Sequence, residues 1–166
     1  ARTAFANAYP AGFPGDRSPR RVAAIPLAAL AAGVLNRDHM SLAAGDAVAS
    51  EILNDAWIQH GLGEVPAVTA ERAGANLARL SADVDLTLFA HYQTDSAGHR
   101  GGMPGAVLAL ERVDALFSGI LGGIDPTALM LVVSDHGNIE DTRGGHTRNP
   151  TLGLAFDIGA VLEAIK

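Results

Sequence analysis

An apolar run that ends in acidic and imidazole side chains constrains this chain more than any other feature. Residues 128–133 read Ala-Leu-Met-Leu-Val-Val, and Asp135 and His136 follow almost at once. A short run without interleaved polar residues is typical of a strand buried on both faces, as in parallel sheets. In open α/β sheets, ligands bind beyond the carboxyl ends of the strands. The sequence therefore predicts a buried strand whose end carries polar side chains to a binding site.

A second segment upstream has the same layout. Residues 85–90, Asp-Leu-Thr-Leu-Phe-Ala, also predict a buried strand, and Asp95 and His99 follow it. Side chains four residues apart meet on one face of a helix, so a helical turn would aim these two at one point. Two neighbouring parallel strands would bring five side chains to one rim: Asp95, His99, Asp135, His136 and His146. Carboxylate and imidazole both bind divalent cations, so this pattern predicts a metal site.

The remaining chain predicts helices and one more strand. Apolar residues at three- and four-residue spacing indicate helices at 42–60 and 104–121. Thr69 is expected to cap a helix from Ala70 to about Leu80. Further expected elements are a helix late in 22–35, a strand at 151–156, a short helix at 157–166 and an irregular segment at 1–20. Strands that alternate with helices predict an α/β fold with three α/β/α layers and a mostly parallel sheet. The chain opens without a leading strand pattern, so we expect this sheet to lack its N-terminal strand or strands.

Composition excludes several functions. The net charge of −6, without a basic run, argues against nucleic-acid binding. The chain has no cysteine, which excludes disulfides and thiolate metal sites. No apolar run approaches the roughly 20 residues that a membrane span requires, and no signal peptide is visible. We therefore expect a cytoplasmic protein without a membrane partner.

Three motifs together resemble the C-terminal metal motifs of the alkaline phosphatase superfamily. They are Asp95-Ser96-Ala97-Gly98-His99, Ser134-Asp135-His136-Gly137-Asn138 and His146-Thr147-Arg148-Asn149-Pro150. Their order and spacing are most similar to those of the cofactor-independent phosphoglycerate mutase and phosphopentomutase branch. The resemblance covers about residues 84–152, the expected metal-site core. Residues 1–80 carry no assignable motif and are a candidate cap or connecting region within the same domain, 1–166.

The resemblance implies two divalent metal ions, usually Mn²⁺ or Zn²⁺, in the complete enzyme. Asp95, His99 and His146 match the ligands of one metal, and Asp135 and His136 match two ligands of the second. In the family, an Asp on the first strand and a nucleophilic Ser or Thr complete the second site, and neither has a match here. The expectation is therefore a truncated, C-terminal portion of the enzyme that is inactive alone and holds as few as one metal.

The implied reaction is metal-dependent phosphoryl transfer of the phosphomutase type on a small phosphorylated substrate. One alternative is a hydrolase of phosphate or sulfate esters on the same scaffold, and another is a metal-binding remnant without turnover. An Asp-His pair before a glycine is also ordinary turn chemistry, so the metal interpretation depends on all three motifs together.

Neighbouring residues have candidate supporting roles. Three arginines, Arg100, Arg143 and Arg148, could bind a phosphate, although surface charges or ion-pair partners are equal alternatives. Four polar residues are candidates for orienting the histidines: Asn138, Glu140, Asp141 and Thr147. A sheet without its first strand would expose an edge or an apolar face, which predicts self-association.

Overall fold

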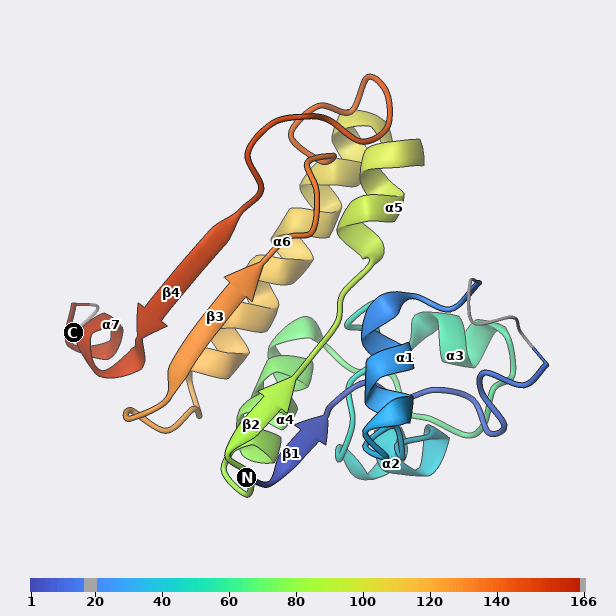
Figure 1. Cartoon of the computed structure of the whole chain (residues 1–166), viewed down its shortest axis with the longest axis vertical. Helices are drawn as coiled ribbons and strands as arrows, with labels where there is room; N and C mark the ends of the chain where they lie inside the picture. Colours follow the sequence, from blue (N-terminus) through green and yellow to red (C-terminus); the bar gives the residue numbers. More distant parts are fainter. Residues whose placement is uncertain (17–20, 165–166) are drawn as a thin grey trace.

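The computed structural model describes residues 1–16 and 21–164, and this part of the chain forms seven helices and four strands (Figure 1). Their order is β1 (Thr3–Phe5), α1 (Ala24–Ala31), α2 (His39–Ala44), α3 (Asp55–Gln59), α4 (Ala70–Ser81), β2 (Leu86–Leu88), α5 (Gln93–Arg100), α6 (Gly102–Leu121), β3 (Leu129–Val133), β4 (Gly153–Asp157) and α7 (Ile158–Ala164). The predicted α/β class is confirmed. None of the helices in these ranges combines the length and apolar character that a membrane crossing requires.

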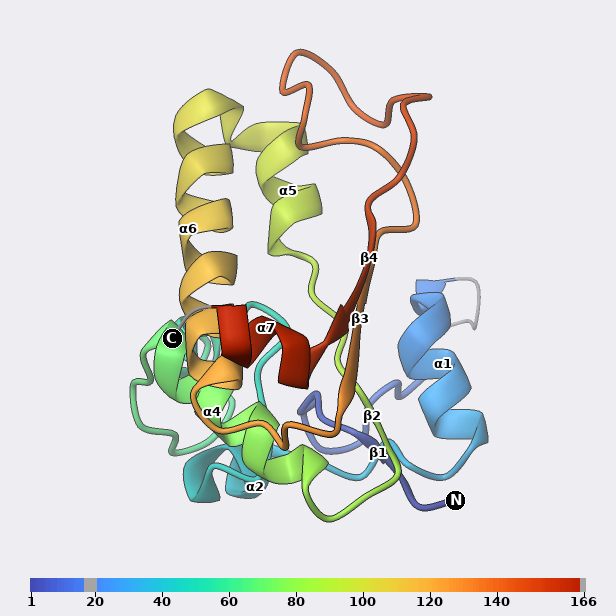
Figure 2. The ribbon, with the colours of Figure 1, turned by 90° about the vertical axis from the view of Figure 1, so that its left-hand side faces the viewer.

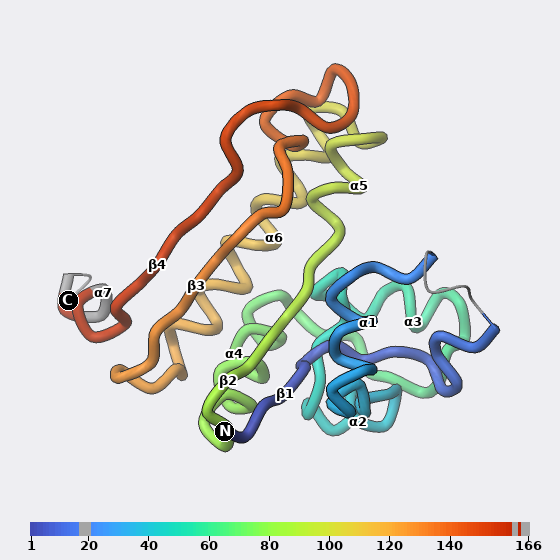
Figure 3. The backbone as a smooth tube through the Cα atoms, viewed as in Figure 1, coloured from blue at the N-terminus to red at the C-terminus, as the bar shows by residue number. Residues whose placement is uncertain are grey.

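The strands form two separate pairs. β1 runs parallel to β2, with Thr3 opposite Leu86, and β3 runs antiparallel to β4, with Leu129 opposite Asp157. The prediction of a mostly parallel sheet is therefore wrong for the pairing of β3 with β4. A parallel pair needs a crossover connection, usually a helix, whereas a loop without a helix joins β3 to β4 and lets the chain reverse direction (Figure 3).

The prediction that residues 1–20 are irregular is also wrong at residues 3–5. β1 lies within the segment expected to be irregular, and the amide of Ala6 extends its pairing by donating to the carbonyl of Leu88 at 2.8 Å. Phe5 is only 1% exposed and packs with Ala29 of α1 and Ala90. Three residues are too few to show a periodic pattern, so this strand depends on its tertiary partners.

β3 is covered on one face only. Met130 packs toward the core formed by α4 and α6, which lie on one side of the strands in the edge-on view (Figure 2). Residues on the other face remain open, with Leu131 63% and Val133 79% exposed. The prediction that 128–133 is buried on both faces is therefore wrong in the described structure. The apolar composition that suggested two covered faces instead leaves an exposed hydrophobic strip.

The core is built where α4 meets α6. Leu77 and Leu80 of α4 pack with Leu116 and Ile120 of α6. The helices approach closely because glycines face the opposing backbone. A Cβ on Gly119 would collide with the carbonyl oxygen of Glu71, and one on Gly74 with that of Leu116. The N-cap predicted for α4 is confirmed, since the hydroxyl of Thr69 accepts from the amide of Arg72 at 3.2 Å.

The long helix predicted at 42–60 is wrong. α2 starts one residue after its cap, Asp38, and ends at Gly45, whose φ of 77° is left-handed. The chain then pairs Val48 with Asn7 before α3 begins. Glycine adopts positive φ without steric cost, so Gly45 ends the helix despite the continuing helical periodicity.

The helix predicted at 104–121 is confirmed as α6, but its first half does not bury Val107 and Leu110, the residues at apolar helical spacing that were expected to face the core. Ala106 and Ala109 are each 3% exposed, whereas Val107 and Leu110 are 46% and 49% exposed. α5 contacts α6, and its buried residues, Ala97 and Gly98, are small. Small side chains on both helices permit this close approach, which places α5 beside the loops after β3.

Candidate metal centre

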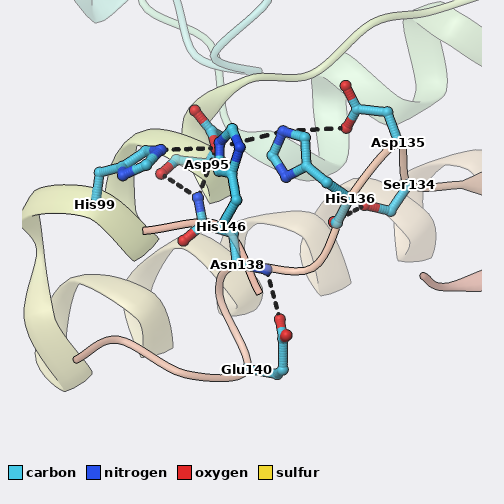
Figure 4. Close-up of polar contacts among 8 residues, drawn as sticks. All are labelled: Asp95, His99, Ser134, Asp135, His136, Asn138, Glu140 and His146. Carbon is cyan, nitrogen blue, oxygen red and sulfur yellow. Dashed lines mark hydrogen bonds and ion pairs between the residues drawn. The ribbon is translucent and has the colours of Figure 1, made fainter. Parts of the chain in front are cut away.

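The five predicted ligands come from three segments that converge. Asp95 and His99 lie on α5, Asp135 and His136 follow β3, and His146 lies in the loop that leads to β4. Figure 4 shows the rings of His99, His146 and His136 arranged around Asp95, with Asp135 beyond His136. The structure therefore brings all five together, as the sequence predicts.

One carboxylate oxygen lies at the centre of the cluster. Oδ1 of Asp95 is 3.3 Å from Nε2 of His99, 3.4 Å from Nε2 of His146 and 3.8 Å from Nε2 of His136. The geometry of α5 explains the first contact, because residues four apart on a helix lie on the same face. The other two contacts depend on how the loops fold back against α5.

The three imidazole rings lie beside one another. The ring centroids of His136 and His146 are 3.7 Å apart at an interplanar angle of 24°, and those of His99 and His146 are 4.9 Å apart. Each ring turns its Nε2 toward Asp95. This packing orients three nitrogen donors toward one region.

Asp95, His99 and His146 have a spacing that is compatible with a bound divalent metal. Their donor atoms all lie within 4.8 Å of one another, and they are the only such group of three among the described residues. Ligands about 2.1 Å from a tetrahedral zinc are about 3.4 Å apart. The two distances from Asp95 to the histidines, 3.3 and 3.4 Å, match this separation. The donor set and its spacing therefore fit a metal such as Zn²⁺ or Mn²⁺.

Asp135 and His136 form a more open pair next to this group. Their Oδ1 and Nε2 atoms are 3.5 Å apart, and the Asp135 side chain is 88% exposed, against 30% for His136. The contact between His136 and Asp95 joins this pair to the first group. Two donors alone leave most of a metal's coordination positions open.

Asn138 holds the carboxylate of Asp95 in place through hydrogen bonds. This residue is 4% exposed, and its Nδ2 donates to Oδ1 of Asp95 at 2.5 Å and to the Asp95 carbonyl oxygen at 3.1 Å. It packs so closely on α5 that a Cβ on Gly98 would collide with its Oδ1. Outer contacts of this kind orient metal ligands.

Glu140 accepts hydrogen bonds from both site loops. Its Oε2 accepts from the amide of Asn138 at 2.7 Å, and its Oε1 accepts from the hydroxyl of Thr147 and from Nδ2 of Asn149 at 3.0 Å. These bonds, with that from Thr147 foremost, lower the pKa of the Glu140 carboxyl to about 2. Glu140 is therefore an anion at neutral pH and needs no metal to keep its charge.

The arginine candidates differ in their surroundings. Arg143 makes a bidentate pair with Asp141, with both N···O distances at 2.7 Å, and this pairing lowers the pKa of Asp141 to about 2. Arg100 ends α5, Arg148 follows His146 by two positions, and both residues are exposed. A phosphate would have to compete with Asp141 for Arg143, whereas Arg100 and Arg148 face solvent beside the site.

Three residues that shape the site received no role from the sequence. Gly98 and Gly137 leave room for side chains that pack against their backbones, and Asn149 is a partner of Glu140. Gly98 stands between Asp95 and His99 on α5, and a glycine inside this predicted helical turn was the signal that could have indicated close packing. Asn149 belongs to the third motif, but the motif gave no role for it, because its partner is in the other loop.

Similarity to known proteins agrees with this site. Over 63 residues, the chain is 44% identical to a phosphopentomutase of Methylobacterium sp. (strain 4-46), a match that covers 37% of this chain and 16% of the relative. Over 101 residues, it is 32% identical to a 2,3-bisphosphoglycerate-independent phosphoglycerate mutase of Paracoccus denitrificans (strain Pd 1222), covering 55% of this chain and 20% of the relative. The chain thus spans no more than about a fifth of these curated relatives. No solved structure matches the chain.

The family comparison covers the whole candidate centre. Residues 65–153, more than half of the chain, match the model of the Metalloenzyme superfamily. This range begins before α4 and contains all five predicted ligands, from Asp95 to His146. The chain therefore belongs to the metalloenzyme superfamily.

Proposed function

We propose that this chain supplies metal ligands for phosphoryl transfer of the phosphomutase type. The observation that carries the proposal is the convergence of Asp95, His99 and His146, whose donor atoms lie within 4.8 Å of one another. The names of the matched relatives, phosphopentomutase and phosphoglycerate mutase, support a small phosphorylated sugar or acid as the substrate class. The proposal concerns the chemistry for which these residues are suited.

The three residues have distinct roles in the proposed site. Asp95 offers an anionic oxygen, and His99 and His146 offer Nε2, which must be unprotonated to bind a metal. Asp135 and His136 are proposed to hold a second ion, beside the first group, since Nε2 of His136 lies 3.8 Å from Oδ1 of Asp95. A pair of divalent metals supplies charge stabilisation for the attacking and leaving oxygens of an in-line phosphoryl transfer. Asn138 keeps Asp95 oriented throughout, because it holds the same oxygen that faces the histidines.

The proposed nucleophile is a Ser or Thr that this chain does not contain. Ser134 is close to the site, but its hydroxyl donates to the carbonyl of His136 at 2.8 Å and stabilises the loop. Ser96 lies on α5 between two of the proposed ligands. Arg100 and Arg148 are proposed to contact the phosphate of the substrate, because the guanidinium group of an arginine can donate two parallel hydrogen bonds to a phosphate.

Metal stoichiometry tests the proposed site directly. The chain is equilibrated with Mn²⁺ or Zn²⁺ and examined by native mass spectrometry, with His146→Ala as the ligand variant and Arg148→Ala as the control in the same loop. We expect at least one metal per chain, lost in His146→Ala and retained in Arg148→Ala. Absence of bound metal in the unchanged chain would refute the proposed site.

Complementation separates the three functions. The chain is mixed with a polypeptide that carries the family's first strand and nucleophile, together with Mn²⁺ and a pentose phosphate. An isomerised sugar phosphate supports the mutase, and release of free phosphate supports the hydrolase alternative. Metal binding without either product supports the non-enzymatic alternative. Turnover by this chain alone would contradict the assignment of the nucleophile to another segment.

A further inference from the structure

We propose that Glu140 is a positioning residue that holds the two ligand-bearing loops, residues 134–141 and 145–149, at the distance that a metal requires. This inference rests on the proposed metal site, because its effect is on the spacing of Asp95 and His146. Glu140 does not contact the cluster directly. It acts through Asn138 on one side and through Thr147 on the other.

The carboxylate bonds to both loops at once. Oε2 accepts from the amide of Asn138 in its own loop at 2.7 Å. Oε1 accepts two bonds from the other loop, from the hydroxyl of Thr147 and from Nδ2 of Asn149 at 3.0 Å. All three partners are donors toward Glu140, and an ionised carboxylate only accepts hydrogen bonds. Its two oxygens therefore suit this set of partners.

The backbones of the two loops also touch beneath the carboxylate. The amide of Thr147 donates to the carbonyl of Gly137 at 2.9 Å, and the two residues form an isolated antiparallel bridge. A Cβ on Gly137 would collide with the hydroxyl oxygen of Thr147 and lie 2.6 Å from Oε1 of Glu140. A single backbone hydrogen bond lets the two loops rotate relative to each other. The three hydrogen bonds of the Glu140 carboxylate therefore fix their relative orientation.

Each end of this arrangement leads to a proposed ligand. On one side, Asn138 receives its orientation from Glu140 and donates to Oδ1 of Asp95 at 2.5 Å. On the other side, Thr147 is the residue next to His146. A continuous series of contacts through the Glu140 carboxylate therefore connects Asp95 with His146. We infer that this series sets the distance of 3.4 Å between Oδ1 of Asp95 and Nε2 of His146.

Asp141 provides a matched control, because it is an adjacent carboxylate with a local role. It accepts from the amide of Arg143 at 3.1 Å and from its guanidinium, and Arg143 lies in the same turn two residues on. Its bonds with Arg143 do not reach the loop that holds His146. Removal of this charge changes the local turn but leaves the connection between the loops intact.

The experiment compares Glu140→Ala, Glu140→Gln and Asp141→Asn in the whole chain. Co²⁺ is the probe, because its visible absorption reports the coordination geometry as well as the affinity. We expect Glu140→Ala to weaken Co²⁺ binding by about 10–100-fold, the usual effect of losing an outer partner, and to change the absorption spectrum. Glu140→Gln keeps one acceptor oxygen, so its Co²⁺ affinity should lie between those of Glu140→Ala and the unchanged chain. Asp141→Asn should have the affinity and spectrum of the unchanged chain. Unchanged affinity and spectrum in Glu140→Ala would overturn the proposal.

A second readout does not require metal. In the metal-free protein, the nuclear Overhauser contact between Gly137 and Thr147 reports the loop distance, and α5 resonances report the fold. We expect Glu140→Ala to lose this contact while the α5 resonances stay in place, and a retained contact would overturn the role of Glu140. If the unchanged chain binds no Co²⁺ yet the contact depends on Glu140, the proposed metal site fails and the positioning role survives.

Discussion

The α4–α6 interface and the loops of the candidate centre both depend on close approach, but they achieve it by different means. At the interface, Gly74 and Gly119 let two helix backbones meet, and leucine and isoleucine side chains surround the contact. At the centre, Gly98 and Gly137 let polar side chains reach a backbone, and hydrogen bonds hold them. Burial of apolar surface supplies most folding free energy, whereas a hydrogen bond contributes about 1 kcal/mol net. The interface should therefore determine stability, and the centre should determine ligand geometry.

The largest expected effect is the loss of metal binding in His146→Ala with little change in stability. His146 supplies one of three donors, so its removal should weaken Zn²⁺ binding beyond the about 10–100-fold typical of outer partners. Its side chain is 53% exposed, so the free energy of unfolding without metal should hardly change. Calorimetric titration and urea unfolding measure the two quantities, with Arg148→Ala as the control. A large loss of stability would show that the centre also supports the fold.

The converse change affects the interface. Gly119→Ala places a Cβ against the carbonyl of Glu71, and such overpacking should lower the free energy of unfolding by about 1–3 kcal/mol. Gly105→Ala is the matched control in the same helix, where a Cβ meets nothing within 4 Å. That variant should gain about 0.5–1 kcal/mol, because glycine disfavours a helix interior. Equal effects in the two variants, measured by urea unfolding, would contradict the packing explanation.

A third change tests the boundary between the two regions. Gly98→Ala lies in α5, where alanine favours the helix, but its Cβ would displace Oδ1 of Asn138. We expect Mn²⁺ affinity to fall by about tenfold through loss of the contact from Asn138 to Asp95. The control is Ser96→Ala, two residues before Gly98 and therefore on the opposite side of α5. This variant should keep the affinity. Wild-type affinity in Gly98→Ala would mean that Asn138 can move without consequence.

The open face of β3 allows a test of self-association, which remains a prediction. Leu131 and Val133 are exposed, whereas Met130 packs toward the core on the opposite face. We expect the chain to associate at high concentration and Leu131→Ser to reduce the association. Sedimentation velocity measures the degree of association. The control Met130→Ala should lower the free energy of unfolding without reducing the association as Leu131→Ser does. A sharp monomer for the unchanged chain at high concentration would refute the prediction.

The smallest expected effect is on acid stability. The pKa of Asp141 is lowered to about 2 by its pair with Arg143, and that of Glu140 to about 2 by Thr147. A folded-state pKa below the unfolded value means that each group stabilises the fold above about pH 4 and that this contribution disappears as the pH falls through 2. Glu140 is exposed and the Asp141 side chain is 32% exposed, so solvent screens both groups and the contribution is small. In carboxyl NMR titrations, Arg143→Ala should raise the midpoint of Asp141 and leave that of Glu140 unchanged.

Much of the centre could be predicted from sequence because its parts are local. The i, i+4 spacing of Asp95 and His99 requires only that 93–100 be helical, and Asp135 and His136 follow directly from β3. His146 was expected at the same rim from neighbouring strands, but its contact with Asp95 depends on how its loop folds back against α5, which no local rule describes. Asn149 stood in the third motif without a role, because its role exists only through Glu140 in the neighbouring loop.

The sequence by itself determined the α/β class, the positions of α4 and α6, and the segments that carry the candidate ligands, since these follow from periodicity, caps and residue chemistry. Only the tertiary structure decided the pairing of β1 with β2, the antiparallel direction of β4 and the exposed face of β3. It also decided that Ala106 and Ala109, rather than Val107 and Leu110, are buried. The physical reason is that periodicity records which residues are apolar, whereas burial depends on which neighbour is close enough to cover them.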